Sequence, residues 1–239
     1  VAQDRSDAER FKALGMSDAK IIVSGSIKFD ISVSEEARQE AANLREQLAG
    51  KTLVALISSH QDEERQFIEQ MTPHLRHRPE VTLMIIPRHP ERFSEVADLC
   101  ESSGFIYSRR SEGQLSPEAR IYLADTMGEL LTLCGAIDIA VMGGSFVDVG
   151  GHNPLEPAVW SVPVIMGPYH YNFAAITQAM SQAGGMVLCD SMAQAAEQTS
   201  LWLDAAQGHS AAGEAANGYA ESQKGALNRL YQVVKARLI

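Results

Sequence analysis

The chain has 239 residues, of which 45% are hydrophobic and 21% are charged, and its formal net charge is −10. This composition is typical of a globular chain and excludes a disordered one. Acidic residues outnumber basic residues by 30 to 20, which argues against a nucleic-acid partner because neutralising phosphates requires clustered Lys and Arg. The balance still leaves room for one anionic ligand in a local basic pocket.

The first thirty residues differ from the rest of the chain. A charged helix is predicted over Asp4–Leu14, and Gly15 is its stop signal. A short apolar strand, Lys20–Val23, then leads into the segment 24–30, which reads SGSIKFD. We expect residues 1–30 to be a remnant of a preceding domain with its connector, and residues 31–239 to form one domain.

The remaining sequence alternates short apolar runs with amphipathic stretches. The runs are rich in β-branched residues and do not alternate in polarity, which is typical of parallel strands covered by helices on both faces. We expect strands at Leu53–Ile57, Val81–Ile86, Phe105–Tyr107, Arg120–Leu123, Ile137–Met142, Val162–Met166 and Met186–Leu188. We expect helices at Ser34–Leu48, Glu63–Met71, Glu91–Ser102, Gly128–Cys134, Pro154–Val159, Phe173–Ala183, Ala193–Ala205 and Ala211–Leu238. This order predicts a doubly wound α/β parallel sheet of the Rossmann type, in which ligands bind beyond the carboxyl ends of the strands.

The three cysteines are odd in number, widely spaced and set in apolar surroundings: Cys100, Cys134 and Cys189. They are typical of buried thiols in a reducing compartment rather than of a disulfide or zinc framework. No apolar run approaches the roughly 20 residues that a membrane span needs, and no signal peptide is evident. We therefore expect a soluble, cytoplasmic chain whose membrane attachment, if any, lies elsewhere.

Polar and glycine residues follow four of the predicted strands. They are Ser58, Ser59 and His60; Pro87, Arg88 and His89; Asp125 and Thr126; and Gly143, Gly144 and Ser145. The Arg88 guanidinium suits an anionic ligand, because its fixed fork matches phosphate or carboxylate geometry; alternatively it is an exposed loop residue. Ser58, Ser59 and His60 either donate to sugar or phosphate oxygens or simply end the strand.

The densest motif is the segment 142–157, which has four glycines within nine residues. Asn153 at the N-cap, Pro154 at the first helical position and Glu156 two residues later would cap a helix without any ligand. Capping does not explain the glycines, which let the backbone approach a ligand closely. We expect a loop that contacts phosphate or sugar, with the Glu156 carboxylate accepting hydrogen bonds from a ribose.

A second helix start follows another strand. Thr126 and Glu129 match a capping box. Because this helix start opens on the same sheet edge, the backbone groups of Met127, Gly128 and Glu129 could read the edge of a flat base. Lys28, near the predicted domain connection, is either a surface charge or a functional cation.

Several familiar motifs are absent from the sequence. No strand is followed by G-x-G-x-x-G, by the G-x-x-x-x-G-K-[ST] phosphate loop or by the G-x-S-x-G nucleophile elbow. H-E-x-x-H does not occur. His74 and His77 are spaced for one helix face, but we expect them in a Pro-flanked loop without an adjacent acidic or Cys ligand that would complete a metal site.

The ordered motifs SGSIKFD, ISSHQDEE, IIPRHPERF, DTMGEL, MGGSFVDVGGHNPLEPA and MGPYHYNF resemble those of the bacterial 3-deoxy-D-manno-oct-2-ulosonic acid (Kdo) transferases of lipopolysaccharide biosynthesis. The resemblance covers nearly the whole chain from about Asp4 but only the second half of the family's usual length. It implies the C-terminal half of a two-domain GT-B glycosyltransferase. It also implies a CMP-Kdo donor, transfer to a lipid A precursor (lipid IVA) with inversion, and no metal or other cofactor.

The resemblance also assigns roles to residues. Those at the family's CMP site are Pro87, Arg88, Met127, Gly128, Glu129, Asn153, Pro154, Leu155 and Glu156. Lys28 falls where a charge stabilises the transition state, although many members read Gly-Asn where this chain has Gly25-Ser26. The family's general-base Glu and its membrane-associating segment, at the cytoplasmic face of the Gram-negative inner membrane, belong to the amino-terminal half. We therefore expect this chain alone to bind nucleotide without transferring sugar.

Two alternatives stay open at this point. One is another nucleotide-sugar enzyme of the same architecture, such as a UDP-sugar transferase or epimerase, since its ribose and phosphate contacts would look alike. The other is a nucleotide-binding or regulatory module with no chemistry of its own.

Overall fold

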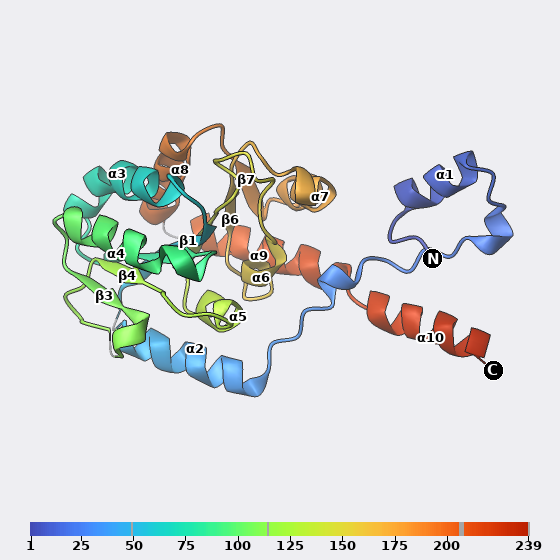
Figure 1. Ribbon diagram of the computed structural model, residues 1–239, viewed down its shortest axis with the longest axis horizontal. Helices are drawn as coiled ribbons and strands as arrows, with labels where there is room; N and C mark the ends of the chain where they lie inside the picture. The colour runs from blue at the N-terminus through green and yellow to red at the C-terminus, as the bar shows by residue number, and fades with distance from the viewer. Residues whose placement is uncertain (49, 114, 206–207, 239) are drawn as a thin grey trace. The chain divides into compact units, whose positions relative to one another are not determined.

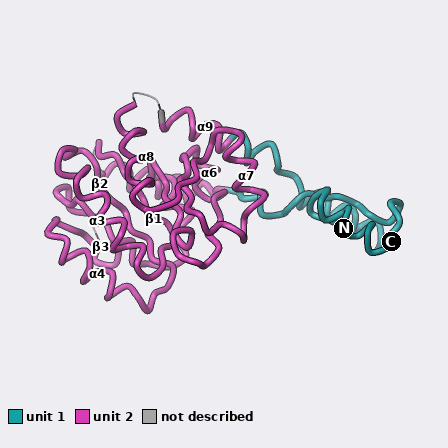
Figure 2. Tube along the Cα trace, turned by 90° about the horizontal axis from the view of Figure 1, so that it is seen from above, with its two compact units in different colours: residues 1–32, 218–239 teal, residues 33–217 magenta. Residues whose placement is uncertain are grey.

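A computed structural model describes the whole chain except residues 49, 114, 206–207 and 239. Its contacts form two compact units, residues 1–32 with 218–239, and residues 33–217 (Figure 2). The two ends of the chain thus belong to the same unit. The predicted division into a connector over residues 1–30 and one binding domain over residues 31–239 stays a prediction.

The larger unit is built on a seven-stranded parallel sheet (Figure 1). In chain order the strands are β1 (Thr52–Ser59), β2 (Val81–Pro87), β3 (Tyr107–Arg109), β4 (Ile121–Leu123), β5 (Ile139–Met142), β6 (Val164–Met166) and β7 (Met186–Leu188). Their spatial order is β3-β4-β2-β1-β5-β6-β7, so the winding direction reverses between β1 and β5. This is the topological switch point at which α/β sheets bind ligands.

Helices cover both faces of this sheet. In chain order they are α2 (Glu35–Gln47), α3 (Glu63–Arg76), α4 (Phe93–Ser102), α5 (Leu130–Cys134), α6 (Leu155–Ala158), α7 (Ala174–Gln182) and α8 (Met192–Asp204). Apolar residues of α3, α4 and α8 share one core cluster with Val54 and Leu56 of β1, while α2 and α5 pack together on the opposite side (Figure 1). Because successive strand residues point to opposite faces, the complete burial of β1 from Leu53 to Ile57 requires this double covering.

The parallel register brings the strand ends to one level. Ile57 of β1 pairs with Ile86 of β2 and with Met142 of β5, so the chain leaves all three central strands at the same sheet edge. Most element boundaries lie within a few residues of those predicted, but the Pro-flanked loop expected at His74 is wrong, because α3 continues past Met71 to Arg76 with Pro73 inside it. The prediction of a doubly wound parallel sheet is confirmed.

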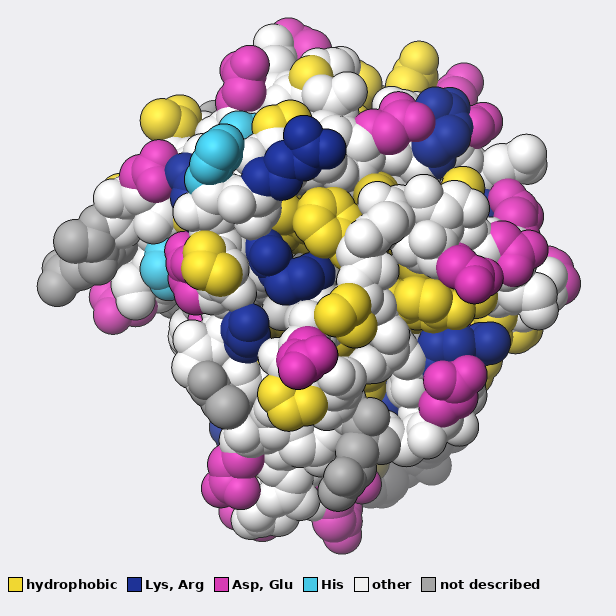
Figure 3. Space-filling model, turned by 90° about the vertical axis from the view of Figure 1, so that its left-hand side faces the viewer, with side chains coloured by type: hydrophobic (Ala, Val, Ile, Leu, Met, Phe, Trp, Pro, Cys, Tyr) yellow, Lys and Arg dark blue, Asp and Glu magenta, His cyan; other side chains and the backbone are white. Residues whose placement is uncertain are grey.

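The surface around the edge strand β3 carries mixed charges. Basic and hydrophobic side chains lie side by side there, with acidic groups around them (Figure 3). Arg109 pairs with Asp125 at 2.8 Å and Arg110 pairs with Glu129 at 3.2 Å. The positive charges of these two arginines are therefore balanced locally.

The smaller unit contains α1 (Arg5–Ala13), two single-turn helices η1 (Asp18–Lys20) and η2 (Ile27–Phe29), and α10 (Ala226–Leu238). The predicted strand Lys20–Val23 is wrong: Val23 makes only an isolated parallel bridge to Ala2. A strand needs a paired neighbour over several residues, and the described part of this unit offers one position.

The predicted single helix Ala211–Leu238 is also wrong. It is divided into α9 (Gly208–Ser222) and α10. Gly225 has a φ of +95°, which only glycine adopts readily. The Asp30 carboxylate accepts hydrogen bonds from the backbone N–H groups of Gly225 and Leu227, both at 2.6 Å. Asp30 thus caps α10, and although burial opposes them, these bonds hold its pKa below the ordinary value.

All three cysteines are free and buried, as predicted. Among the described residues, no helix combines the length and apolar character that crossing a bilayer requires.

Candidate functional site

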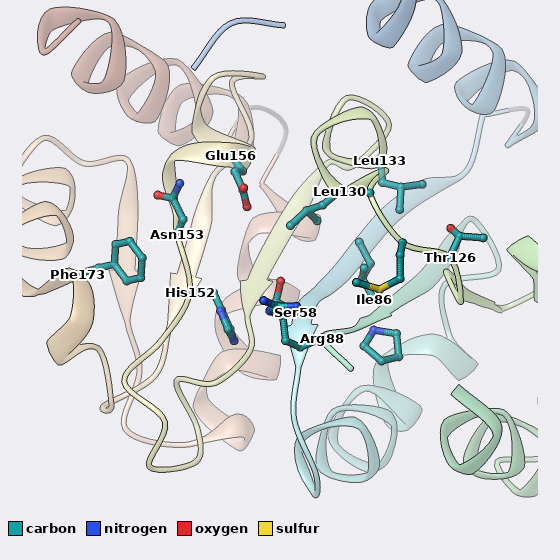
Figure 4. Close-up of a pocket in the computed structure, with 13 residues that line it drawn as sticks. Ser58, Ile86, Arg88, Thr126, Leu130, Leu133, His152, Asn153, Glu156 and Phe173 are labelled. Atoms are coloured by element: carbon teal, nitrogen blue, oxygen red, sulfur yellow. The ribbon is translucent and has the colours of Figure 1, made fainter. Parts of the chain in front are cut away.

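A cavity of about 310 Å³ opens at the carboxyl edge of the sheet, beside the switch point. Its wall is formed by residues that follow β1, β2, β4 and β5, together with Phe173 (Figure 4). The structure brings seven of the predicted site residues to this wall: Ser58, Pro87, Arg88, Met127, Gly128, Asn153 and Glu156.

One end of the cavity is basic and polar. Ser58, Arg88 and His152 lie close together there (Figure 4). Ser58 has a φ of +55°, unusual for a residue other than glycine, and the β1–β2 register shifts at the same point. The Arg88 backbone N–H donates to the Ser59 carbonyl at 3.0 Å, which fixes the start of the loop that carries the guanidinium. The arrangement can hold an anion.

Glu156 lies at the other end, with its carboxylate directed toward the cavity (Figure 4). It makes no hydrogen bond or ion pair with any residue that the structure describes. Burial raises its pKa, and the charge of Arg88 opposes that rise. A half-buried carboxylate without an internal donor can accept hydrogen bonds from a ligand's hydroxyl groups.

Asn153 stands beside Glu156 and differs slightly from its predicted role. Helix α6 begins at Leu155 with Pro154 in the N-cap position, so the predicted placement of Asn153 as N-cap and Pro154 as first helical residue is wrong by one position. The Asn153 side chain nevertheless accepts from the Leu155 N–H at 3.2 Å. It satisfies one of the unpaired N–H groups that every helix start presents.

Besides these two ends, the cavity has an apolar wall that contains Ile86, Leu130 and Leu133. Met127 and Gly128 also line the cavity. The predicted capping box is wrong, because α5 begins only at Leu130. The Thr126 hydroxyl donates to the Glu129 carboxylate rather than accepting from a backbone N–H. Arg110 draws that carboxylate away from the backbone with two contacts of 3.2 Å, so Glu129 is outside the cavity lining.

The other predicted contacts are also absent from the cavity lining. Ser59, Ser145 and Leu155 are completely buried; the Ser59 hydroxyl donates to Glu64 at 2.8 Å and the Ser145 hydroxyl to the Met142 carbonyl at 2.6 Å. His60, Gly143, Gly144 and Pro154 likewise lie outside it. Lys28 belongs to the other compact unit, where it lies in η2.

Sequence reasoning missed the two carboxylates that hold the site together. Glu63 and Glu64 begin α3 and are completely buried. Glu63 accepts from the backbone N–H groups of His60 at 2.9 Å, Gly144 at 2.7 Å and Phe146 at 3.0 Å, thereby tying the loop after β1 to the loop after β5. Burial raises the pKa of Glu63, and the three hydrogen bonds lower it only in part. The pair of glutamates in ISSHQDEE, directly after a buried strand, was the available signal.

Glu64 forms the second part of this support. It accepts from Ser59 at 2.8 Å and from Arg92 at 2.6 Å and 3.2 Å. Burial lowers the pKa of Arg92, but its bonds to Glu64 and Glu95 outweigh that effect and raise it. Glu64 thereby links Ser59, at the end of β1, to Arg92 in the segment that follows β2.

His152 is a further residue that sequence reasoning missed, although it lies within GGHNPLE. Its Nε2 atom is 2.8 Å from Nε2 of His60, and the two rings are nearly coplanar and meet edge to edge, with centroids 5.1 Å apart. Burial and nearby positive charge lower the pKa of His152 to about 4 and also lower that of His60. In the part of the chain that the structure describes, no group of three or more His, Cys, Asp or Glu side chains is placed to hold a metal ion.

The chain is similar to curated proteins over its whole length. It is 34% identical to the 3-deoxy-D-manno-octulosonic acid transferase of Haemophilus influenzae over 241 residues, covering 100% of this chain and 56% of that protein. It is 32% identical to the transferase of the same name from Bordetella pertussis over 234 residues, covering 96% of this chain and 54% of that protein. The chain thus spans about half the length of these relatives. No model of a protein family matches it.

Solved structures agree with this similarity. The C-terminal CMP-Kdo binding domain of WaaA from Acinetobacter baumannii is 32% identical and superposes with a TM-score of 0.69, covering 76% of this chain and 98% of that domain. MnaA from S. aureus, solved with UDP, superposes with a TM-score of 0.63 at 15% identity, covering 99% of this chain and 60% of that protein, and so shares the fold alone. Identity and coverage together show that the chain belongs to the Kdo transferase family.

Proposed function

We propose that this chain is the donor-binding half of a Kdo transferase and that its cavity takes the CMP part of CMP-Kdo. The cavity supports this proposal because it combines three surfaces that a nucleotide requires. Arg88 offers a guanidinium to the phosphate, Glu156 offers a carboxylate to the ribose, and an apolar wall accepts the base. The observation that carries the proposal is the Glu156 carboxylate, which faces the cavity and has no hydrogen-bond donor among the residues that the structure describes.

The backbone at Met127 and Gly128 lies where it can read the edge of cytosine. Asn153 sets the start of α6, so that Glu156 is held in place. Glu129, Pro154 and Leu155 act through their own backbone groups rather than through their side chains. Ser58, which lines the cavity, remains a candidate contact for the sugar of the donor. The other candidates lie outside the cavity lining and would act only as supports: Ser59, His60, Gly143, Gly144 and Ser145.

In the complete protein we propose that Kdo is transferred to a lipid A precursor with inversion and without a metal ion. When the glycosidic bond breaks, the departing CMP gains negative charge, and fixed cations must stabilise it. Arg88 does so from the cavity, and Lys28 does so when acceptor and donor halves come together. The general base and the contact with the cytoplasmic face of the inner membrane belong to the other half, so this chain alone binds without turnover.

Calorimetric titration of the chain with CMP, UMP and UDP tests the proposal. We expect CMP to bind more tightly than UMP or UDP, because the wall near Met127 and Gly128 reads the base and Arg88 offers one guanidinium to a single phosphate. A preference for UDP would instead indicate a UDP-sugar enzyme of the same fold. Absence of binding by all three nucleotides would indicate that the cavity has another ligand.

A further inference from the structure

Two histidines, His60 and His152, form a pair at the basic end of the cavity, and each lies in a loop that follows a central strand. His60 follows β1, and its backbone N–H is held by Glu63 at 2.9 Å. His152 comes from the loop after β5 and lines the cavity. Their Nε2 atoms are 2.8 Å apart and their ring planes differ by 9°. In such a contact one Nε2 must donate and the other must accept.

The backbone of Gly144 supports both rings. Its φ is +65°, and a Cβ atom there would lie 3.0 Å from the His152 ring and 3.4 Å from the His60 ring. A larger residue would therefore crowd both rings. His89 stands edge-on to His60, with ring centroids 5.2 Å apart. The geometry of the pair is thus fixed from several sides before any ligand arrives.

The charges around the pair are mostly positive. Arg88, Arg92 and His89 act on His60, with Glu64 opposing them, and Arg88 and His89 act on His152. Together with burial they keep both imidazoles neutral at pH 7. Neither Nδ1 atom is hydrogen-bonded to a residue that the structure describes. The pair therefore has the capacity to accept a proton and to donate another hydrogen bond.

We propose that His60 and His152 form a phosphate subsite together with Arg88, and that the pair takes up one proton from solvent when a nucleoside monophosphate binds. This inference rests on the proposed function, since it takes the same nucleotide as its ligand. The phosphate dianion reverses the local potential that keeps the pair neutral. Protonation retains the Nε2–H···Nε2 hydrogen bond and gives one ring an N–H at both nitrogens, which makes it a charged donor to an anion.

The sign of the pH dependence follows from this scheme. The free pair has a depressed pKa, and the bound phosphate raises it, so protons are taken up at any pH between the two values. CMP affinity should therefore increase as pH falls from 8 toward 6.5, by up to about tenfold per pH unit. Below about pH 6 the phosphate itself becomes protonated and the trend ends.

Titration calorimetry at pH 7.5 in two buffers of different ionisation enthalpy measures the proton count directly. We expect the chain to take up on the order of one proton per CMP and none with cytidine, which lacks the phosphate. The small fraction of CMP that is protonated at this pH would release protons on binding, so CMP cannot itself account for uptake.

Variants of the two histidines test whether the pair takes up the proton. His152→Gln should abolish uptake and weaken CMP about tenfold at pH 7, and His60→Gln should act in the same direction. His77→Gln, which changes an exposed histidine at the end of α3, should behave like the unchanged chain. The melting temperature of each variant shows whether it folds.

Two results would overturn the inference while leaving the proposed function intact. One is CMP binding to the unchanged chain without proton uptake, a result that needs no variant. The other is uptake that persists in folded His152→Gln and His60→Gln. If CMP does not bind at all, the inference and the proposed function both fail.

Discussion

The cavity wall and its buried support use the same residue types for opposite purposes. In the support, Glu63 accepts hydrogen bonds from the neighbouring backbone, and Glu64 pairs with Arg92. On the wall, the Glu156 carboxylate has no hydrogen-bond donor in the described part of the chain, and Arg88 faces the cavity. The comparison teaches that neither burial nor charge alone marks a ligand-binding residue in this fold. The mark is a charged group on the cavity wall whose hydrogen-bonding capacity the described residues leave unused.

The largest expected effect comes from breaking the support at Arg92. Arg92→Ala removes the partner of the completely buried Glu64 and leaves an uncompensated charge, so we expect a loss of about 3 to 5 kcal/mol in unfolding free energy. Urea denaturation measures it. Arg65→Ala, which removes exposed ion pairs with Asp62 and Glu69, is the matched control and should cost less than about 1 kcal/mol. Equal losses in the two variants would contradict the role of the support.

Glu63→Gln should have the next largest effect. The amide keeps one acceptor oxygen but turns an NH₂ group toward backbone N–H donors that the carboxylate now satisfies. We expect a loss of about 2 to 4 kcal/mol in unfolding free energy, again by urea denaturation. Glu118→Gln, at an exposed position, controls for the charge change. A loss as small as that of the control would show that the two loops are held by other contacts.

For residues of the cavity wall, we expect a large effect on CMP affinity and a small effect on stability. Arg88→Ala should weaken CMP binding roughly 10- to 100-fold, because a charged hydrogen bond to the phosphate is lost, and should change unfolding free energy by less than about 1 kcal/mol. Calorimetry and denaturation of the same sample provide both numbers. Arg76→Ala, at an exposed position in α3, should leave CMP affinity unchanged. Unaltered CMP affinity in Arg88→Ala would show that the phosphate does not bind at this end of the cavity.

Glu156 should show the smallest effect on stability, with a characteristic pH dependence. Its pKa is raised in the folded state, so ionisation disfavours folding and the unfavourable contribution appears as pH rises through the folded pKa. Glu156→Gln should therefore be slightly more stable than the unchanged chain at pH 7, by less than about 1 kcal/mol, with no difference near pH 4. The same variant should bind CMP more weakly than the unchanged chain but better than Glu156→Ala, since the amide keeps an acceptor for ribose. A loss of stability at pH 7 with normal CMP affinity would make Glu156 a helix cap.

The sheet and the edge at which ligands bind could be predicted from sequence because both depend on local patterns. Buried apolar runs define parallel strands, and their shared register brings the residues after them together. This is why Arg88, Met127 and Glu156 were predicted near one another although they are far apart in the chain. Their part in binding stays a prediction.

The support was not predicted, because the pair of glutamates that follows β1 does not by itself show that Glu63 and Glu64 are completely buried. Acidic residues at a helix start are usually exposed, and their burial depends on loops after β2 and β5 that reach them in space. The break between α9 and α10 was missed for a similar reason. Its cap, Asp30, lies 195 residues away in sequence. The pairing of His60 with His152 likewise depends on contacts between two distant loops.

A crystal structure of the chain with CMP would test the central claim most directly. We expect the phosphate within hydrogen-bond distance of the Arg88 guanidinium and the ribose hydroxyls on the Glu156 carboxylate. The base should lie against the wall that includes Leu130 and Leu133, and Glu63, Glu64 and Arg92 should keep their contacts with one another and with the backbone. CMP bound elsewhere, or bound in the cavity without contact to Glu156 and Arg88, would contradict the account.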